Sequence, residues 1–231
     1  MPTVLIAGAT GAVGSALVPA LRKDGMKVIP HVRPKTAERH PLGQDKHALI
    51  ADLTDVAKLD AAMERVQAIV CSVGTMRRRF AAGDTYLSSD YEPVAQLVDS
   101  ALRMKGAKRY FVLVSALGAR SGSGYLGWKF KAEEVVRLSG LPHAILRPSF
   151  LDSTKSNSQA SDGKQRAPPP LFGSVLRGLG VFPKMKGVSE DLRPIPVEVL
   201  CDAIAKLIRK NENQAHVLTG RQLWPLAKAL R

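Results

Sequence analysis

The sequence contains little cysteine. Its 231 residues include two, Cys71 and Cys201, and these lack the close spacing of the ligand pairs in a zinc or iron–sulfur site. This scarcity predicts neither a metal centre nor a disulfide framework. We expect both thiols to be reduced and packed in the interior.

Long hydrophobic runs are absent as well. No apolar stretch reaches the roughly 18 to 20 residues that a helix needs to cross a bilayer. The first strand-like segment begins almost at Met1, which leaves no room for a charged region followed by an apolar leader. We therefore expect a cytoplasmic protein without a membrane span.

Acidic and aromatic residues are scarce beside the basic ones. The chain has 20 Asp and Glu against 34 Lys and Arg, a formal net charge of +14, and 5% aromatic residues. Such an excess attracts phosphates, nucleic acids or anionic surfaces. However, residues 151–231 carry a net +6 and residues 1–150 the remaining +8, so the charge is spread along the chain. Because a nucleic-acid binder concentrates its charge and interleaves aromatic side chains, we expect a small-molecule ligand instead.

A glycine motif stands at the start of the chain. Gly8, Gly11 and Gly14 follow the apolar run 4–7 and precede a helical pattern of apolar residues from Val13. Glycines at this spacing allow a tight turn, close approach of a pyrophosphate and packing of the helix against the strand, while the first helical amides face the anion. The motif predicts a nucleotide site; the alternative is a tight strand-to-helix turn.

Strand-like and helical patterns alternate along most of the chain. The predicted strands are 4–7, 27–33, 47–51, 68–73, 109–115, 143–147, 192–196 and 216–219, and the predicted helices begin at Val13, cover 56–66, 85–104, 129–138, 172–179 and 197–209, and begin again at Leu223. Continuous apolar strands separated by helices predict an α/β fold, a Rossmann-type doubly wound parallel sheet covered on both faces.

The alternation is interrupted after residue 150. We expect residues 1–150 to form a Rossmann nucleotide-binding domain and residues 151–231 a small C-terminal lobe on its substrate side. Residues 152–170 are rich in Ser, Asn, Gln and Lys and end in three prolines, a composition that favours a flexible loop. This loop is either a lid over the site or a surface insertion without a role.

Arg33 ends the second predicted strand, the position that distinguishes NAD from NADP in a dinucleotide-binding unit. An acidic residue there accepts the ribose hydroxyls of NAD, whereas a basic residue pairs with the 2′-phosphate of NADP. No Asp or Glu occurs between Gly25 and Thr36, and Lys35 adds a second positive charge. The sequence therefore favours NADP over NAD; the alternative for Arg33 is a solvent-exposed strand end.

Two further segments follow predicted strands at the edge where the nucleotide would lie. Asp52 and Leu53 come after the third strand, where the carboxylate could accept from the adenine amine, although Asp52 could equally cap the next helix. The segment Ser72–Gly74 ends the fourth strand, and we expect its backbone beside the adenosine ribose. The following run Arg77–Arg79 is either a solvated loop or a site for an anionic group.

Ser115, Tyr125 and Lys129 have the residue types of a proton-transfer site. Ser115 ends the fifth predicted strand, and Tyr125 and Lys129 are four residues apart, one helical turn. Hydride transfer at a carbinol carbon needs a proton donor or acceptor at the oxygen, which a tyrosine supplies when an ammonium lowers its pKa and a serine holds the oxygen. We also expect Lys129 to hydrogen-bond the nicotinamide ribose. The alternative is a surface tyrosine and lysine on an amphipathic helix.

These motifs together resemble an atypical short-chain dehydrogenase/reductase, similar to its NmrA-like and NAD(P)H-binding members. The resemblance covers residues 3–151 and rests on the glycine motif, Val32-Arg33, Asp52-Leu53, Cys71 to Gly74, Val114 to Gly118, Tyr125-x-x-x-Lys129 and Leu146 to Ser149. It implies an NADP(H)-dependent oxidoreductase acting on a small carbonyl or hydroxyl substrate, with Pro148 beside the nicotinamide. Some members keep the cofactor site without catalysis, which leaves an NADP(H)-sensing regulatory protein as the alternative.

The resemblance and the motifs together define one set of site residues. The short Gly- and Ser-rich stretch 119–124 and the small last lobe depart from the extended members and argue against a large nucleotide-sugar substrate. The predicted catalytic residues are Ser115, Tyr125 and Lys129. The predicted cofactor-binding residues are Gly8, Thr10, Gly11, Ala12, Val13, Gly14, Arg33, Asp52, Leu53, Ser72, Val73, Gly74, Lys129 and Pro148.

Overall fold

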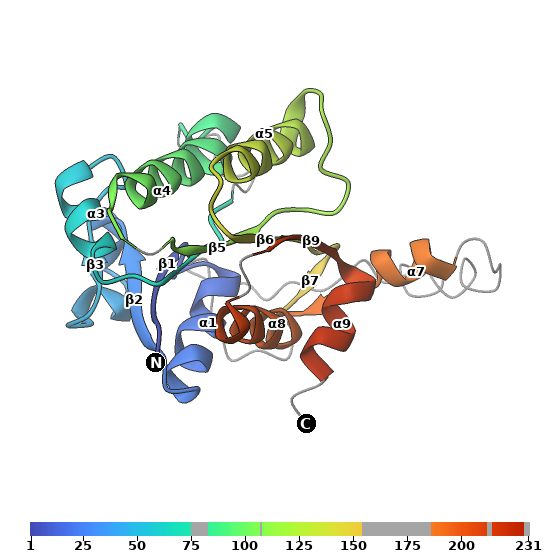
Figure 1. Cartoon of the computed structure of the whole chain (residues 1–231), viewed down its shortest axis with the longest axis horizontal. Coiled ribbons are helices and arrows are strands. Elements are labelled where there is room, and N and C mark those ends of the chain that lie inside the picture. The colour runs from blue at the N-terminus through green and yellow to red at the C-terminus, as the bar shows by residue number, and fades with distance from the viewer. Residues whose placement is uncertain (75–82, 107, 154–185, 212–213, 229–231) are drawn as a thin grey trace.

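A seven-stranded sheet forms the centre of the computed structural model, which describes residues 1–74, 83–106, 108–153, 186–211 and 214–228 (Figure 1). The strands are β1 (Thr3–Ala7), β2 (Lys27–Val32), β3 (Leu49–Ile50), β4 (Ala68–Cys71), β5 (Tyr110–Val114), β6 (His143–Arg147) and β9 (Ala215–Thr219). Their order is β3-β2-β1-β4-β5-β6-β9, and every neighbouring pair is parallel. The order reverses direction between β1 and β4, which confirms the predicted doubly wound α/β sheet.

Helices cover both faces of this sheet (Figure 1). One layer contains α1 (Ala12–Lys23), α8 (Val197–Lys210) and α9 (Gly220–Lys228), and the other contains α3 (Val56–Met63), α4 (Glu92–Arg103) and α5 (Gly124–Leu138). On β1, Val4 and Ile6 belong to the core beneath α1 and α8, whereas Leu5 and Ala7 belong to the core beneath the other layer. A strand covered on both faces has to be apolar at successive positions. Among the described residues, no helix is long and apolar enough to span a bilayer.

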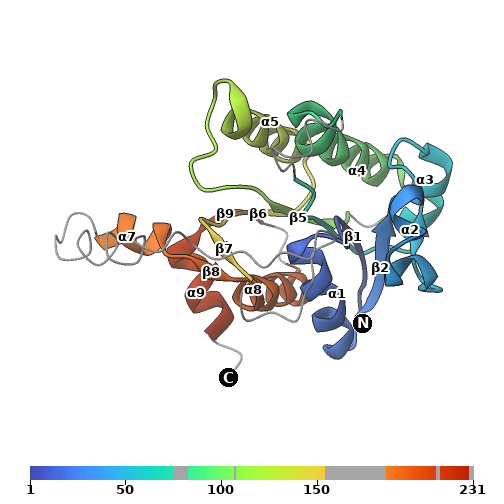
Figure 2. The same ribbon diagram turned by 180° about the vertical axis from the view of Figure 1, so that it is seen from behind.

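The C-terminal part of the chain shares this core. Strand β9 pairs with β6, and α8 packs against α1 with its buried apolar face. A separate parallel pair, β7 (Leu151–Asp152) and β8 (Ile195–Pro196), lies with α7 (Lys186–Leu192) toward the β9 side of the molecule (Figure 2). Residues after 150 therefore contribute a strand and a helical layer to the Rossmann core, in addition to this peripheral part.

Several elements differ from the predicted ones in their bounds. Helix α5 begins at Gly124 rather than Lys129, so Tyr125 lies in its first turn. The predicted helix 85–104 begins with a π-helical turn, η3 (Leu87–Tyr91), before α4. The predicted strand 47–51 is reduced to β3 at the sheet edge, where it pairs with β2. The predicted strand 192–196 is reduced to β8, and its first residue, Leu192, is the last residue of α7.

Between β2 and β3 the chain forms the short helix α2 (Pro34–Ala37) and the 3-10 turn η1 (Pro41–Gln44). Both begin with proline, which fits a first helical turn because that position has no intrahelical amide bond to lose. Three predicted features lie outside the described residues: the helix 172–179, the run Arg77–Arg79 and nearly all of the expected flexible loop 152–170.

Candidate functional site

A cavity of about 440 Å³ opens at the carboxyl ends of β1, β4 and β5, where the strand order reverses. Open α/β sheets bind their ligands at such a switch point. Most of the predicted site residues line it: Gly8, Thr10, Gly11, Ala12, Val13, Arg33, Asp52, Leu53, Ser72, Val73, Gly74, Ser115, Tyr125 and Lys129. The two predicted residues not among its lining are Gly14 and Pro148.

The glycine loop forms the wall of this cavity nearest α1. Gly8 has a φ of +84°, and a Cβ there would lie 2.9 Å from the carbonyl carbon of Ser72 and the amide of Val73. A Cβ at Gly14 would lie 2.2 Å from the carbonyl oxygen of Gly8, so Gly14 allows the close contact of helix and strand behind the loop. The first turn of α1 contains no acidic residue and no side-chain cap. Its amides and positive dipole end are therefore available to an anion.

Arg33 and Asp52 line the far end of the same cavity. Arg33 is exposed and precedes the first turn of α2. Asp55 caps α3 by accepting a hydrogen bond of 3.2 Å from the amide of Lys58, so the capping role considered for Asp52 belongs to Asp55. His31, which the sequence did not single out, also lines this end. Its Nε2 lies 2.9 Å from the carbonyl oxygen of Ala51, and burial lowers its pKa.

Tyr125 and Lys129 project from one face of α5 toward the cavity. The Lys129 ammonium lies 5.8 Å from the centroid of the Tyr125 ring and 3.3 Å from the carbonyl oxygen of Val73, to which it donates. The Lys129 side chain is 4% exposed, whereas Tyr125 is 36% exposed and contacts the ring of Tyr86 with centroids 5.9 Å apart. The structure thus brings a buried ammonium and an accessible phenol together on one helical turn.

Asp90 is a site residue that the sequence analysis missed. Its Oδ1 lies 3.0 Å from Lys129 Nζ, and both side chains are almost fully buried. Burial disfavours the charged form of Lys129, but the charges of Tyr125 and Asp90 outweigh it and raise the pKa of the lysine. The signal in the sequence was weak, because Asp90 falls inside the predicted helix 85–104, where a charged residue usually belongs to the solvent-exposed face.

Glu133 is the second missed residue, one turn beyond Lys129 on α5. The hydroxyl of Ser115 donates to Glu133 Oε1 at 2.6 Å, and Arg147 donates to both carboxylate oxygens, from Nε at 2.9 Å and Nη2 at 2.5 Å. Arg137 adds a fourth contact, 2.8 Å from its Nη2 to Glu133 Oε2. The carboxylate is fully buried, and its hydrogen bonds raise the pKa of Arg147. Ser115 therefore presents lone pairs, rather than its proton, to the cavity.

Pro148 follows β6 and is buried. Its carbonyl oxygen accepts a hydrogen bond of 2.9 Å from the amide of Leu117, which ties the segment after β6 to the segment after β5. Leu151, three residues on, does line the cavity. Pro148 itself is not among the residues that line the cavity.

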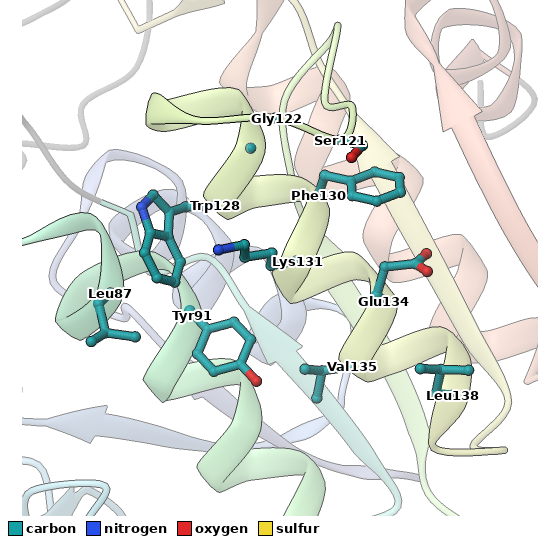
Figure 3. Close-up of a pocket in the computed structure, with 11 residues that line it drawn as sticks. Leu87, Tyr91, Ser121, Gly122, Trp128, Phe130, Lys131, Glu134, Val135 and Leu138 are labelled. Atoms are coloured by element: carbon teal, nitrogen blue, oxygen red, sulfur yellow. The ribbon is translucent and has the colours of Figure 1, made fainter.

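A second hollow, of about 610 Å³, lies on the opposite side of α5 (Figure 3). It is lined by apolar and aromatic side chains that include Leu87, Tyr91 and Trp128, and the Lys131 ammonium lies 4.0 Å from the centroid of the Trp128 ring. None of the predicted site residues lines this hollow. It is therefore distinct from the cavity over the glycine loop.

Neither cysteine is among the described residues that line the cavity. Cys71 and Cys201 are buried, and burial raises the pKa of the Cys71 thiol to about 11 and that of Cys201 further still. Within the described ranges, no group of three or more His, Cys, Asp or Glu side chains could hold a metal ion.

The chain is similar in sequence to several known proteins. The chain is 26% identical over 260 residues to Protein TIC 62, chloroplastic, of Pisum sativum, a match that covers 99% of this chain and 48% of the relative. It is 32% identical over 149 residues to the ceramide reductase of Caulobacter vibrioides, covering 63% of this chain and 45% of the relative. The chain thus spans about half the length of these relatives.

A solved structure from Bacillus halodurans, described as a candidate NAD-dependent epimerase/dehydratase, superimposes with a TM-score of 0.67 at 21% identity and covers 100% of both chains. This likeness shows the fold. The family model described as NAD(P)H-binding matches residues 8–170, from the first glycine of the motif to well beyond β6. The chain therefore belongs to the NAD(P)H-binding family.

Proposed function

We propose that this protein is an NADP(H)-dependent oxidoreductase acting on a small carbonyl or hydroxyl substrate. One observation carries the proposal: the glycine loop and the pair of Tyr125 and Lys129 line the same cavity. A site built only to sense a nucleotide needs the glycine loop, and Lys129 for the ribose, but not an accessible tyrosine beside that ammonium. The relative named as a reductase also favours an enzyme over a regulatory protein.

The cavity fits a dinucleotide along its length. Gly8 leaves space that a Cβ would fill, and the N-terminus of α1 favours the pyrophosphate beside it. At the far end, Asp52 would receive the adenine and Arg33 the 2′-phosphate, which is the basis for proposing NADP rather than NAD. The segment around Pro148 resembles the family stretch whose backbone meets the nicotinamide, and Leu151, three residues on, lines the cavity; this supports the proposal that the nicotinamide lies at this end.

When bound, NADPH would supply the hydride at the reacting end. The side chains there would supply the proton. Tyr125 donates its phenolic proton to the substrate oxygen as negative charge develops there. Lys129 holds two of its three N–H groups toward Asp90 and the carbonyl of Val73 and can direct the third into the cavity, toward the ribose. In the cavity, the Ser115 hydroxyl accepts a hydrogen bond from the substrate. Alternatively, the hydroxyl turns away from Glu133 and donates to the substrate oxygen.

The proposal predicts that purified protein consumes NADPH with at least one member of a panel of aldehydes and ketones. Tyr125→Phe removes the proton donor and should lower turnover by about 10² to 10⁴-fold, while NADPH affinity, measured by fluorescence titration, stays the same. Tyr91→Phe is the matched control, because Tyr91 lines the hollow on the other side of α5. Equal turnover of the wild type and Tyr125→Phe would contradict the proposed role.

A further inference from the structure

Asp90 faces the Lys129 ammonium from a different element. Tyr125 and Lys129 both come from α5, whereas Asp90 comes from the π-helical turn η3 that precedes α4. The carboxylate and the ammonium are 3.0 Å apart and are 0% and 4% exposed. A charged pair removed from water interacts more strongly than the same pair on the surface, so the charge of Asp90 acts on the site with little screening.

The backbone around this pair is built to hold it. Leu87 and Tyr91 of η3 line the hollow on the outer side of α5 (Figure 3). Asp90 of the same turn is buried beside Lys129. Pi-helical turns inside helices are rare and occur often at functional sites. A Cβ at Gly74 would lie 3.3 Å from Lys129 Nζ and 3.4 Å from Asp90 Oδ1. The absence of a side chain at that position therefore leaves room for both charged groups.

The charge of Lys129 alone would favour the phenolate of Tyr125, because the ammonium lies against the Tyr125 ring, 5.8 Å from its centroid, and the two groups interact electrostatically. Asp90 neutralises that ammonium from its other side. Cys71 on β4 is the other titratable group coupled to Lys129. Among the described residues, further titratable side chains at this end include Tyr86 against the Tyr125 ring, Asp84 and Glu92 on the cavity wall, and Glu133, which accepts from Ser115.

We propose that Asp90 is a positioning residue that fixes Lys129 and offsets its charge, so that Tyr125 keeps its proton at neutral pH and acts as a proton donor. The inference rests on the proposed oxidoreductase function and adds a direction to it: the site is set for reduction of a carbonyl, which consumes a proton, rather than for removal of a proton from an alcohol.

The test is a spectrophotometric titration of tyrosinate, which needs neither substrate nor turnover. The chain has four tyrosines, so the difference between a background and the same background with Tyr125→Phe isolates the signal of Tyr125. Asp90→Asn should move the midpoint of this signal to lower pH by about one unit or more. The pH above which NADPH-dependent reduction slows should fall by the same amount.

Glu92→Gln is the matched control, because Glu92 lines the same cavity two residues away, is exposed, and belongs to α4 rather than to the buried pair. Its midpoint should equal that of the wild type. If Asp90→Asn fails to fold, Lys129→Met and the double variant Asp90→Asn/Lys129→Met take its place. The midpoint should rise in the first, where the carboxylate faces the phenol alone, and return toward the wild-type value in the second.

An unchanged or higher midpoint in a folded Asp90→Asn protein overturns the inference, as do equal midpoints in Lys129→Met and the double variant. A different result contradicts the proposed function: the wild type reduces no carbonyl, although Asp90→Asn still shifts the midpoint of Tyr125. If the wild type is active but Asp90→Asn does not shift the midpoint, the proposed function stands and Asp90 has no role in the proton transfer.

Discussion

The two ends of the cavity are built by different means. At the glycine end the surface is backbone: positive φ at Gly8, close contact at Gly14 and the amides of α1. At the end that we propose to be catalytic it is side chains, and buried carboxylates support two of them, Asp90 for Lys129 and Glu133 for Ser115. The glycine end depends on residues without side-chain atoms, whereas the other end depends on buried charges that need partners of opposite charge.

This difference predicts different responses to substitution. Crowding should damage the glycine end, because its residues leave space for a ligand. Loss of one partner should damage the catalytic end, because an uncompensated buried charge is costly. The predictions below test this contrast from the largest effect to the smallest.

Glu133→Gln should destabilise the protein by about 3 to 5 kcal/mol, because it leaves Arg147 without its buried anion and Arg137 with Glu134 alone. Chemical denaturation followed by circular dichroism measures the change. Glu134→Gln is the matched control on the next position of α5, where the carboxylate is 41% exposed and pairs with Arg137 alone. Similar losses in the two variants would show that burial of Glu133 is not what makes this end sensitive.

Gly8→Ala should destabilise the protein by about 1 to 3 kcal/mol and weaken NADPH binding, because the new methyl meets the backbone of Ser72 and Val73 at 2.9 Å. Gly106→Ala separates crowding from backbone strain: Gly106 has a φ of +101°, but no described atom lies within 4 Å of its added Cβ. The difference in unfolding free energy between the two variants measures the crowding. Equal values would remove the packing argument for Gly8.

Arg33→Gln should weaken NADPH binding roughly tenfold or more, the loss expected for a charge-assisted contact with a phosphate, and leave NADH binding unchanged. Titration calorimetry with both cofactors gives the ratio. Lys35→Gln is the control, because Lys35 is the next cation along the chain but does not line the cavity. A wild-type preference for NADH would contradict the proposed cofactor.

The glycine end was predictable from sequence because its requirements are local. The spacing of Gly8, Gly11 and Gly14 behind an apolar strand is sufficient to predict a turn, a helix start and a phosphate site. The alternation of strands and helices likewise predicted the parallel sheet. Local spacing could not show that β9 would pair with β6, because that pairing joins segments on either side of residues 154–185.

The catalytic end was predictable only in part. The four-residue spacing of Tyr125 and Lys129 was visible, but the missed partners lie far away in the sequence: Asp90 is 39 residues before Lys129, and Glu133 is 18 residues after Ser115. The start of α5 was missed because Ser121–Gly124 has the composition of a loop. The helix begins there nonetheless, with the backbone of Gly122 packed where a Cβ at Gly127 would lie, 2.1 Å from the Gly122 carbonyl oxygen.

A partly exposed cluster of similar composition gives the smallest expected effect. Asp60 accepts from Arg103 at two positions, each 2.8 Å, and from the hydroxyl of Ser100 at 2.5 Å. This is the set that surrounds Glu133, a carboxylate with a forked arginine and a serine, placed on the surface between α3 and α4. Asp60→Asn should therefore cost only about 0.2 to 1 kcal/mol at neutral pH, because water screens the pair.

The pH dependence of this small loss tests its cause. The hydrogen bond from Arg103 lowers the pKa of Asp60 below its ordinary value of 3.8. A carboxylate with a depressed pKa in the folded state contributes its full stabilisation above the unfolded value and loses it as the pH falls through the folded value. The difference in unfolding free energy between the wild type and Asp60→Asn should therefore be constant near neutrality and shrink below pH 3.8. A loss as large as that of Glu133→Gln would mean that the chemistry of the cluster, rather than its burial, sets the sensitivity of the catalytic end.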